Sequence, residues 1–226
     1  MNQEETLNKK IIFDAIQKAS PSVVADINAI QQDALDILNE SSSARPSLLS
    51  DIPCEAFIKR IENELVIGTT CETVTTLAKL PEAVYRFLKN HSLDKTIKLQ
   101  NKESFLSLDW SEINIDADIE EDNSVGICWA EYGVAETGSF VIHSSPDMPI
   151  LLNFLPLYLL PVIPKSKILP FMDDYALIAN EIAKNGETPR NMCMISGASG
   201  TTDIEGVLVQ GAHGPEFVHI IIIDDM

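Results

Sequence analysis

The alternation of short apolar segments with amphipathic ones is the feature that most constrains how this chain can fold. Mostly apolar segments predict strands at residues 96–99, 125–129, 139–143, 157–163, 192–195 and 217–223, with shorter strand signals at 66–67 and 73–77. Apolar residues at helical spacing predict helices at 53–63, 81–89 and 173–184. Apolar strands that alternate with helices are typical of a largely parallel sheet covered on both faces. We therefore predict an α/β domain.

The N-terminal part of the chain differs from the rest because it has helical spacing and no strand signal. Apolar residues recur at helical intervals over 7–19 and again over 23–38, and the loop SSSARP follows at 41–46. We predict a helical arm and linker at residues 1–48. The remainder, residues 49–226, has a length that suits one α/β domain with a single core.

The chain is strongly acidic, since 34 Asp and Glu residues stand against 16 Lys and Arg residues and give a net charge of −18. This charge repels the phosphate backbone of nucleic acids and the anionic surface of membranes. The most apolar run, 149–164, is interrupted by Asn153 and four prolines, and residues 1–10 are polar, unlike a secretory signal. We therefore expect a cytoplasmic protein, with no nucleic-acid partner and no membrane insertion.

Metal-binding patterns are weak in this sequence. The four cysteines are too far apart for a CxxC-type site: Cys54, Cys71, Cys128 and Cys193. The acidic stretch 109–122 has carboxylates at alternate positions, but an EF-hand loop would need glycine where Glu121 stands and glutamate where Ile127 stands. We predict buried thiols in a reducing compartment, a solvated acidic loop, and no metal or cofactor bound by this chain.

A turn of small residues follows the strand predicted at 192–195. It reads SGASGTTDIEG over residues 196–206, where Thr202 and Glu205 fit a capping box and Gly211 fits a helix stop, so we predict a helix at 203–210. Backbone N–H groups of 197–201 and the helix dipole would together hold a small anionic metabolite, at the carboxyl edge of the sheet. The candidate ligand-binding residues here are Ser196, Gly197, Ser199, Gly200 and Thr201.

A second turn of small residues, AETGS, occupies 135–139 between two predicted strands. Gly138 permits a close approach of the backbone, and Thr137 beside it is a further ligand-binding candidate. Glu136, if buried, would have a raised pKa and could act as a base or nucleophile. The alternative is that Glu136 hydrogen-bonds to a loop N–H group and only fixes the turn.

Two further side chains are candidates for acid–base or orienting roles. Asp203 would orient a ligand hydroxyl, or would only favour the positive end of the predicted helix. His213, in the loop GAHGP at 211–215, would serve acid–base chemistry or anchor that loop. His219, in the last strand, suits a structural role, and His143 is a weaker candidate. We predict that six residues meet in one cleft: Glu136, Thr137, Ser196, Ser199, Asp203 and His213.

The three motifs AETGS, SGASGTTDIE and GAHGP, the last followed by His219, resemble the LUD-domain family, the lactate-utilisation C-type proteins, in order and spacing. The resemblance covers about residues 50–226. It implies a three-layer α/β sandwich like that of glucosamine-phosphate isomerase, ribose-phosphate isomerase and CoA transferases. It also implies a subunit or accessory factor of L-lactate utilisation, whose iron–sulfur clusters are carried by partner subunits that oxidise lactate to pyruvate.

The sequence departs from the family pattern at the second motif. Ala198 replaces the usual proline, Gly200 replaces a basic residue, and Thr202 replaces alanine. Loss of the cation leaves only backbone N–H groups to bind an anion, whereas a bidentate arginine contact is worth about 1.5–3 kcal/mol. Two alternatives therefore stay open beside the lactate role. One is a stand-alone enzyme of the isomerase or CoA-transferase type with Glu136 as base or nucleophile, and the other is a non-catalytic module that binds a small anion.

Overall fold

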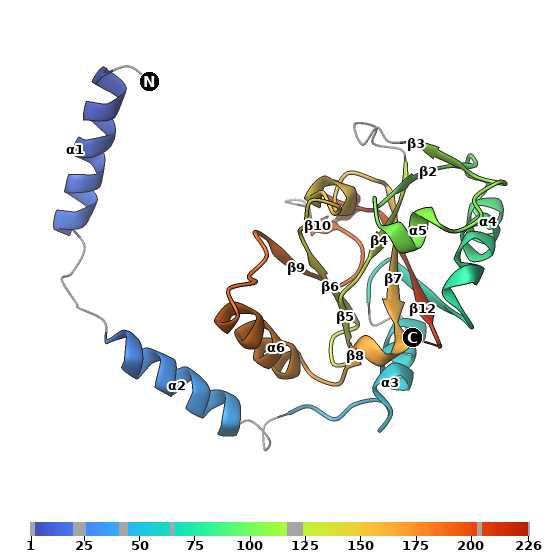
Figure 1. Cartoon of the computed structure of the whole chain (residues 1–226), viewed down its shortest axis with the longest axis horizontal. Coiled ribbons are helices and arrows are strands. Elements are labelled where there is room, and N and C mark those ends of the chain that lie inside the picture. Colours follow the sequence, from blue (N-terminus) through green and yellow to red (C-terminus); the bar gives the residue numbers. More distant parts are fainter. Residues whose placement is uncertain are drawn as a thin grey trace. The chain divides into compact units, whose positions relative to one another are not determined.

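The computed structural model describes residues 3–19, 26–40, 45–63, 66–116, 124–202 and 205–225 (Figure 1). Contacts between residues divide the chain into two units, Met1–Ala44 and Arg45–Met226. The first unit contains the helices α1, Gln3–Ala19, and α2, Ile27–Glu40, and Asp26 caps α2 because its Oδ1 accepts the N–H groups of Asn28 and Ala29. Its helical character agrees with the spacing in the sequence.

The second unit contains all the described strands. Its helices are α3 Pro53–Glu62, α4 Leu80–Asn90, α5 Glu103–Leu106 and α6 Met172–Lys184, with short 3-10 turns at Leu77–Lys79, Ile150–Asn153 and Lys165–Lys167. Its strands are β1 Thr69–Val74, β2 Thr96–Leu99, β3 Asn114–Asp116, β4 Val125–Trp129, β5 Tyr132–Val134, β6 Ser139–His143, β7 Tyr158–Pro164, β8 Ile168–Leu169, β9 Met192–Ile195, β10 Gly200–Thr202, β11 Leu208–Gln210 and β12 Phe217–Ile223.

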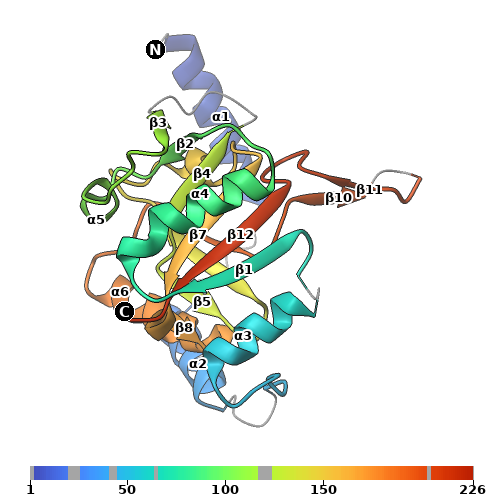
Figure 2. The ribbon, with the colours of Figure 1, turned by 90° about the vertical axis from the view of Figure 1, so that its right-hand side faces the viewer.

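The central sheet has six strands in the order β1-β12-β7-β4-β2-β3, and every neighbouring pair is parallel (Figure 2). β12 shows why the sheet is covered on both faces, since its isoleucines alternate between two cores. Ile220 and Ile222 pack with α3, while Ile221 and Ile223 pack with α4. α4 supplies this second core because its apolar residues recur at helical spacing: Leu80, Ala83, Val84, Phe87 and Leu88.

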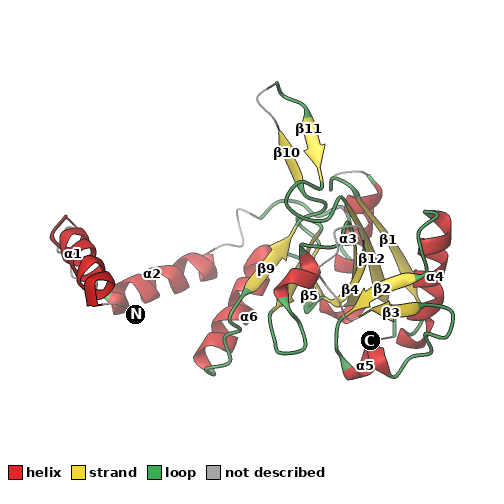
Figure 3. Ribbon diagram, turned by 90° about the horizontal axis from the view of Figure 1, so that it is seen from above, coloured by secondary structure: helices red, strands yellow, loops and turns green. Residues whose placement is uncertain are grey.

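A second sheet, in the order β8-β5-β6-β9, lies on the α3 side of the central sheet (Figure 3). Phe140 and Ile142 of β6 enter the core that includes α3 and the central strands. Val141 points the other way, to the small core that Tyr175 of α6 covers. The predicted α/β fold, with a parallel central sheet flanked by helices, is therefore confirmed. The second sheet is an addition that the sequence pattern does not predict.

The helix predicted at 203–210 is wrong. β10 and β11 instead form an antiparallel ribbon that projects from the body, with Thr201 opposite Val209 (Figures 2 and 3). β-Branched residues stand in both of its strands, and such side chains favour strands over helices. Gly206 has a φ of 82°, and a continuous right-handed helix through this segment would need a negative φ at that residue.

The acidic stretch 109–122 is described only to Asp116. Lys98, which is buried in β2, donates to Asp116 Oδ2 at 2.5 Å, so one of these carboxylates neutralises a cation inside the sheet. The segment 117–123, where the calcium-like spacing continues, lies outside the described residues. No helix in the described parts of the chain is both long enough and apolar enough to cross a bilayer.

Candidate functional site

Two glycines bring the turns at 135–138 and 196–199 against the segment that precedes β1. Gly138 and Gly197 have positive φ angles, 69° and 89°. A Cβ atom at Gly138 would lie 2.6 Å from Val66 Cγ2, and one at Gly197 would lie 2.7 Å from both Val66 Cγ1 and Ile67 O. These distances are too short for any real Cβ, so only glycine permits the approach. We call this meeting of residues 66–69, 135–139 and 196–199 the glycine junction.

Three hydroxyl groups form a chain across the glycine junction. Ser139 Oγ is fully buried, donates to Thr137 Oγ1 at 2.6 Å, and lies 2.5 Å from Ser196 Oγ. Because a hydroxyl carries one hydrogen, Ser196 is the donor to Ser139. The hydrogen of Thr137 Oγ1 can then point to an acceptor supplied by a ligand. Thr137, Ser139 and Ser196, which we call the hydroxyl chain, are thus a neutral set of groups that suits an incoming carboxylate or hydroxyl.

The glycine junction lies at the amino edge of the central sheet, so the predicted position at the carboxyl edge is wrong. Ala198 N donates to Ile67 O at 2.9 Å, and Ser199 N donates to Pro215 O at 2.7 Å. Ile67 and Pro215 precede the first residues of β1 and β12. The reason is that β9 pairs with β6 of the second sheet rather than with a central strand.

The predicted anion cradle also lacks two of its parts. The N–H groups of Ala198 and Ser199 are engaged by backbone carbonyls, and a strand rather than a helix begins at Gly200. There is consequently no helix dipole directed at this turn. Gly200 and Thr201 are exposed members of β10, and Asp203 lies outside the described residues.

Ser199 lies in the glycine junction but not in the hydroxyl chain, and His213 belongs to the neighbouring loop at 211–215. Gly211 N donates to Ser199 O at 2.9 Å, so Ser199 holds both ends of the 211–215 loop. His213 lines a separate hollow of about 420 Å³ with Phe154 and other loop residues. The predicted single cleft is therefore wrong. Thr137 and Ser196 lie in the hydroxyl chain, whereas His213 lines a different hollow.

Glu136 points away from the hydroxyl chain, toward the first turn of α6. Its Oε2 accepts the N–H group of Met172 at 2.9 Å, and its own N–H group donates to Pro170 O. The N–H group of Met172 is in the first turn of α6 and has no partner within the helix, so Glu136 satisfies it. This is the arrangement of the alternative interpretation, in which Glu136 fixes a turn.

His143 lies in the second sheet. Its Nε2 is 2.8 Å from the hydroxyl of Tyr175, and burial lowers the pKa of the imidazole. Burial likewise raises the pKa of the Tyr175 hydroxyl. The pair packs β6 against α6 and lies apart from the glycine junction.

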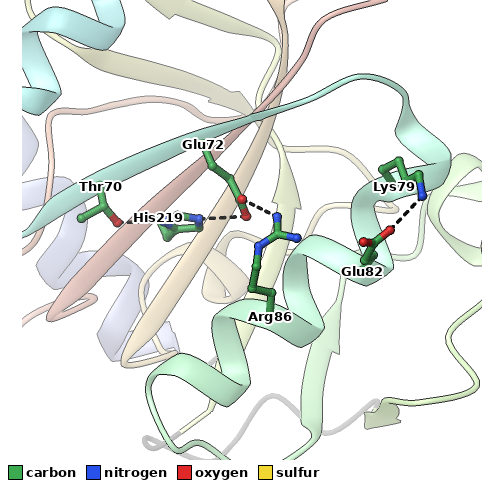
Figure 4. Close-up of polar contacts among 6 residues, drawn as sticks. All are labelled: Thr70, Glu72, Lys79, Glu82, Arg86 and His219. Carbon is green, nitrogen blue, oxygen red and sulfur yellow. Dashed lines mark hydrogen bonds and ion pairs between the residues drawn. The ribbon is translucent and has the colours of Figure 1, made fainter.

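Sequence reasoning missed a second polar cluster, on the face of the central sheet that α4 covers (Figure 4). His219 Nδ1 lies 2.7 Å from Thr70 Oγ1, and His219 Nε2 lies 3.3 Å from Glu72 Oε1. Arg86 of α4 donates to Glu72 Oε2 at 2.5 Å. Thr70 and Glu72 share a face because they are two positions apart on β1, and Thr70 is paired directly with His219 of β12. We call these residues the β1–β12 relay.

The charges within the relay are balanced. Burial acts to raise the pKa of Glu72, but the hydrogen bonds and charges of His219 and Arg86 outweigh it and hold that pKa below its ordinary value. The imidazole of His219 stacks on Phe87, with ring centroids 4.8 Å apart. The signal that could have revealed this cluster is the alternation Thr70-x-Glu72 on a strand, which places two polar groups on the face that α4 partly covers.

Beside the relay lies a hollow of about 480 Å³. It is lined by the first residues of β1 and β12 and the end of α4, including Thr69, Thr70, Phe87, His91, Phe217 and Val218. Stacked rings extend its wall, since Tyr158 lies parallel to Phe217 with centroids 5.0 Å apart. Thr70 is therefore the relay residue that faces this hollow.

The cysteines are dispersed over four elements, and each is a free thiol. Burial raises the pKa of all four, to about 11 for Cys71. Within the described ranges, no group of three or more His, Cys, Asp or Glu side chains is arranged to hold a metal ion.

Comparison with known proteins adds a fold and relatives to this geometry. The chain is similar to a crystal structure of a DUF162 family protein from Deinococcus radiodurans, with a TM-score of 0.51 and 16% identity over 75% of this chain and 98% of that one. It is 33% identical over 187 residues to YkgG of Escherichia coli (strain K12), covering 76% of this chain and 80% of YkgG.

Further relatives are named lactate utilization protein C. The protein from Bacillus subtilis (strain 168) is 35% identical over 135 residues, and that from Geobacillus kaustophilus (strain HTA426) is 36% identical over 113 residues. These matches cover 54% and 50% of this chain, and about half of each relative, 56% and 46%. A model of the LUD domain matches residues 17–223, which include every segment of the glycine junction and the β1–β12 relay. The chain therefore belongs to the LUD-domain family.

Proposed function

We propose that this chain is a subunit or accessory factor of L-lactate utilisation, acting beside iron–sulfur subunits that oxidise lactate to pyruvate. The observation that carries the proposal is the LUD-domain match over residues 17–223, together with relatives named for lactate utilization. In this proposal the clusters that transfer electrons belong to the partners, because the thiols of this chain are dispersed and have raised pKa values.

The hydroxyl chain is the proposed place for a small anionic metabolite. The Thr137 hydroxyl donates to the carboxylate. Ser196 donates to Ser139 and Ser139 donates to Thr137, so these two bonds direct the Thr137 hydrogen toward the metabolite. Arg60 lies beside this turn, but its Nε donates to Ala135 O at 3.2 Å. The direct contacts with the metabolite are therefore hydrogen bonds from hydroxyl groups, each worth about 0.5–1.5 kcal/mol. The affinity for lactate is therefore expected to be modest in the isolated chain.

Growth on L-lactate tests the role. We expect a strain of the source organism without this gene to grow poorly on L-lactate and normally on glucose, and the wild-type gene to restore growth. Ser139→Ala removes the central hydroxyl and should restore growth only partly. Ser166→Ala removes an exposed hydroxyl elsewhere and should restore growth fully. Normal growth of the deletion strain on L-lactate would overturn the proposal.

Native mass spectrometry of the tagged chain, purified from cells grown on L-lactate, tests the partners. We expect co-purified subunits that carry iron and acid-labile sulfide. If the chain is isolated alone from such cells under gentle conditions, the iron–sulfur assembly is wrong, and the stand-alone enzyme becomes the better hypothesis.

A further inference from the structure

The β1–β12 relay has the arrangement of an activated hydroxyl rather than only of a structural ion pair. Three residues connect in series, Thr70 to His219 to Glu72, with the hydroxyl at one end and the carboxylate at the other. A nucleophile within hydrogen-bond reach of a base, with that base oriented by a third group, is the general signature of nucleophilic catalysis.

The direction of the hydrogen bonds follows from the charges. A carboxylate only accepts, so Nε2 of His219 carries a hydrogen and donates to Glu72, and in the tautomer with a single ring hydrogen Nδ1 carries none. Nδ1 is then an acceptor, and the Thr70 hydroxyl donates to it across 2.7 Å. Arg86 binds the other oxygen of Glu72 and keeps the carboxylate ionised. The imidazole is therefore held in the tautomer that can receive the proton of Thr70.

The hydroxyl end of the relay is exposed to solvent, whereas the imidazole and the carboxylate are mostly buried, as a reactive site requires. Only 13% of the His219 side chain and 24% of the Glu72 side chain are exposed, whereas Thr70 is an exposed residue. Phe87 covers one face of the imidazole and also lines the hollow of about 480 Å³ that Thr70 faces. The hydroxyl is thus accessible, while the base behind it is shielded from water.

We propose that Thr70 is a nucleophile, with His219 as its general base, for acyl transfer from a small uncharged ester bound in this hollow. The walls favour an apolar acyl group, because Val66, Ile67, Phe217 and Val218 line them. None of the residues that line this hollow is Lys or Arg, so an anionic substrate would have no cationic partner there. This activity goes beyond the lactate role, and its reactive residues are different from those of the hydroxyl chain.

The step is balanced by the groups present and by water. Thr70 Oγ1 forms a bond to the carbonyl carbon while its proton moves to Nδ1 of His219. The bond from that carbon to the ester oxygen breaks, and the leaving alcohol takes the proton from Nδ1. Water then attacks the acyl-threonine, which releases a carboxylic acid and restores the hydroxyl. Glu72 is a positioning residue, since it acts through His219.

The full-length chain with p-nitrophenyl acetate and p-nitrophenyl butyrate tests the proposal through release of p-nitrophenolate. Thr70→Val keeps the shape and removes the hydroxyl, so it should lower the enzymatic rate by at least about 100-fold. Thr70→Ser should stay within about tenfold of the wild type. The control is Thr73→Val, an exposed threonine on the opposite face of β1, which should leave the rate unchanged.

Peptide mass mapping after an acid quench should locate the acetyl group on Thr70. Glu72→Gln should lower kcat with KM unchanged, and Glu72→Asp should restore part of kcat, whereas a structural role would change the melting temperature without this split. The proposal is overturned if the wild type releases no more p-nitrophenolate than buffer, if Thr70→Val is as active as the wild type, or if the label maps to another residue.

Discussion

Two polar clusters lie on opposite faces of the first residues of β1, and they are built in different ways. Thr69 faces the glycine junction, where a Cβ atom on Gly197 would approach its hydroxyl to 3.0 Å. Thr70, the next residue, faces the relay and contacts His219. Adjacent residues of a strand point to opposite sides, so a single step along the chain changes the chemistry from neutral hydroxyls to a charged network.

The difference shows what makes each cluster visible in a sequence. The glycine junction comes from turns, and turns need glycine, serine and threonine close together, which form recognisable motifs. The relay comes from strand pairing, which joins Thr70 to His219 without any local motif. Tests that disturb one cluster and leave the other intact can therefore measure how far the two depend on each other.

The largest expected effect is from Gly197→Ala in the glycine junction. The new Cβ would meet Ile67 O and Val66 Cγ1 at 2.7 Å, and the φ of 89° adds strain, so the free energy of unfolding should fall by about 3 kcal/mol. The matched control is Gly186→Ala, where φ is 73° but nothing lies within 4 Å of the added atom. Its expected cost is about 1 kcal/mol. Equal costs in urea unfolding would show that the close approach is unimportant.

The next effect concerns the hydroxyl chain. Ser139→Ala leaves Thr137 and Ser196 without their shared buried partner and should cost about 1–2 kcal/mol, while Ser196→Ala at the exposed end should cost less than about 1 kcal/mol. Chemical denaturation of both variants measures the difference. If Ser196→Ala is the more damaging change, the chain is not organised around the buried serine.

A smaller effect is expected from Glu72→Gln in the relay, about 1 kcal/mol at neutral pH, because one charge-assisted contact is lost. The pKa of Glu72 is lowered on folding, so its contribution is complete above the ordinary value of 4.5 and is lost as the pH falls through the lower folded value. Unfolding curves between pH 7 and pH 3 should show the two proteins converging in acid. Glu82→Gln on α4 removes an exposed pair with Lys79 and serves as the control, with no measurable change.

The smallest effect is a pH dependence of the free energy of unfolding that comes from His143, a residue outside both clusters. Burial lowers its pKa, so the unfolded chain binds more protons below the ordinary value of 6.5, and stability falls as the pH drops through that region. We expect His143→Gln to flatten this part of the curve while keeping the bond to Tyr175. If the free energy of unfolding of the variant depends on pH as strongly as that of the wild type, the effect comes from another group.

The strands were predictable wherever apolar character was continuous, as in 125–129, 139–143 and 217–223, which match β4, β6 and β12. The ribbon of β10 and β11 was not predictable in the same way, because the capping-box spacing that indicated a helix at 203–210 also fits the turn of a ribbon. What decided between them was the β-branched content of Thr201, Thr202, Val207 and Val209, together with Gly206.

The candidate site was predictable only in part. Both small-residue turns meet at one junction, as their glycines indicated, but the side chain of Glu136 is directed to α6 and His213 lines another hollow. The central position of Ser139 could not be read from spacing, since it depends on the pairing of β6 with β9. The relay depends on the pairing of β1 with β12, which no local pattern specifies.

That last pairing also sets the order in which the protein can assemble. β1 is an edge strand and its neighbour in the sheet is β12, with Thr69 opposite Val218, so it has no sheet partner until most of the chain has been made. At a synthesis rate of about 5–20 residues per second, β1 emerges from the ribosome roughly 7–30 s before the strand it needs. Closing so long a loop is slow, because its entropy is lost before any contact is gained. Docking of β1 is therefore a late event in the assembly of this sheet, and the hydroxyl of Thr70 meets its imidazole only when that event is complete.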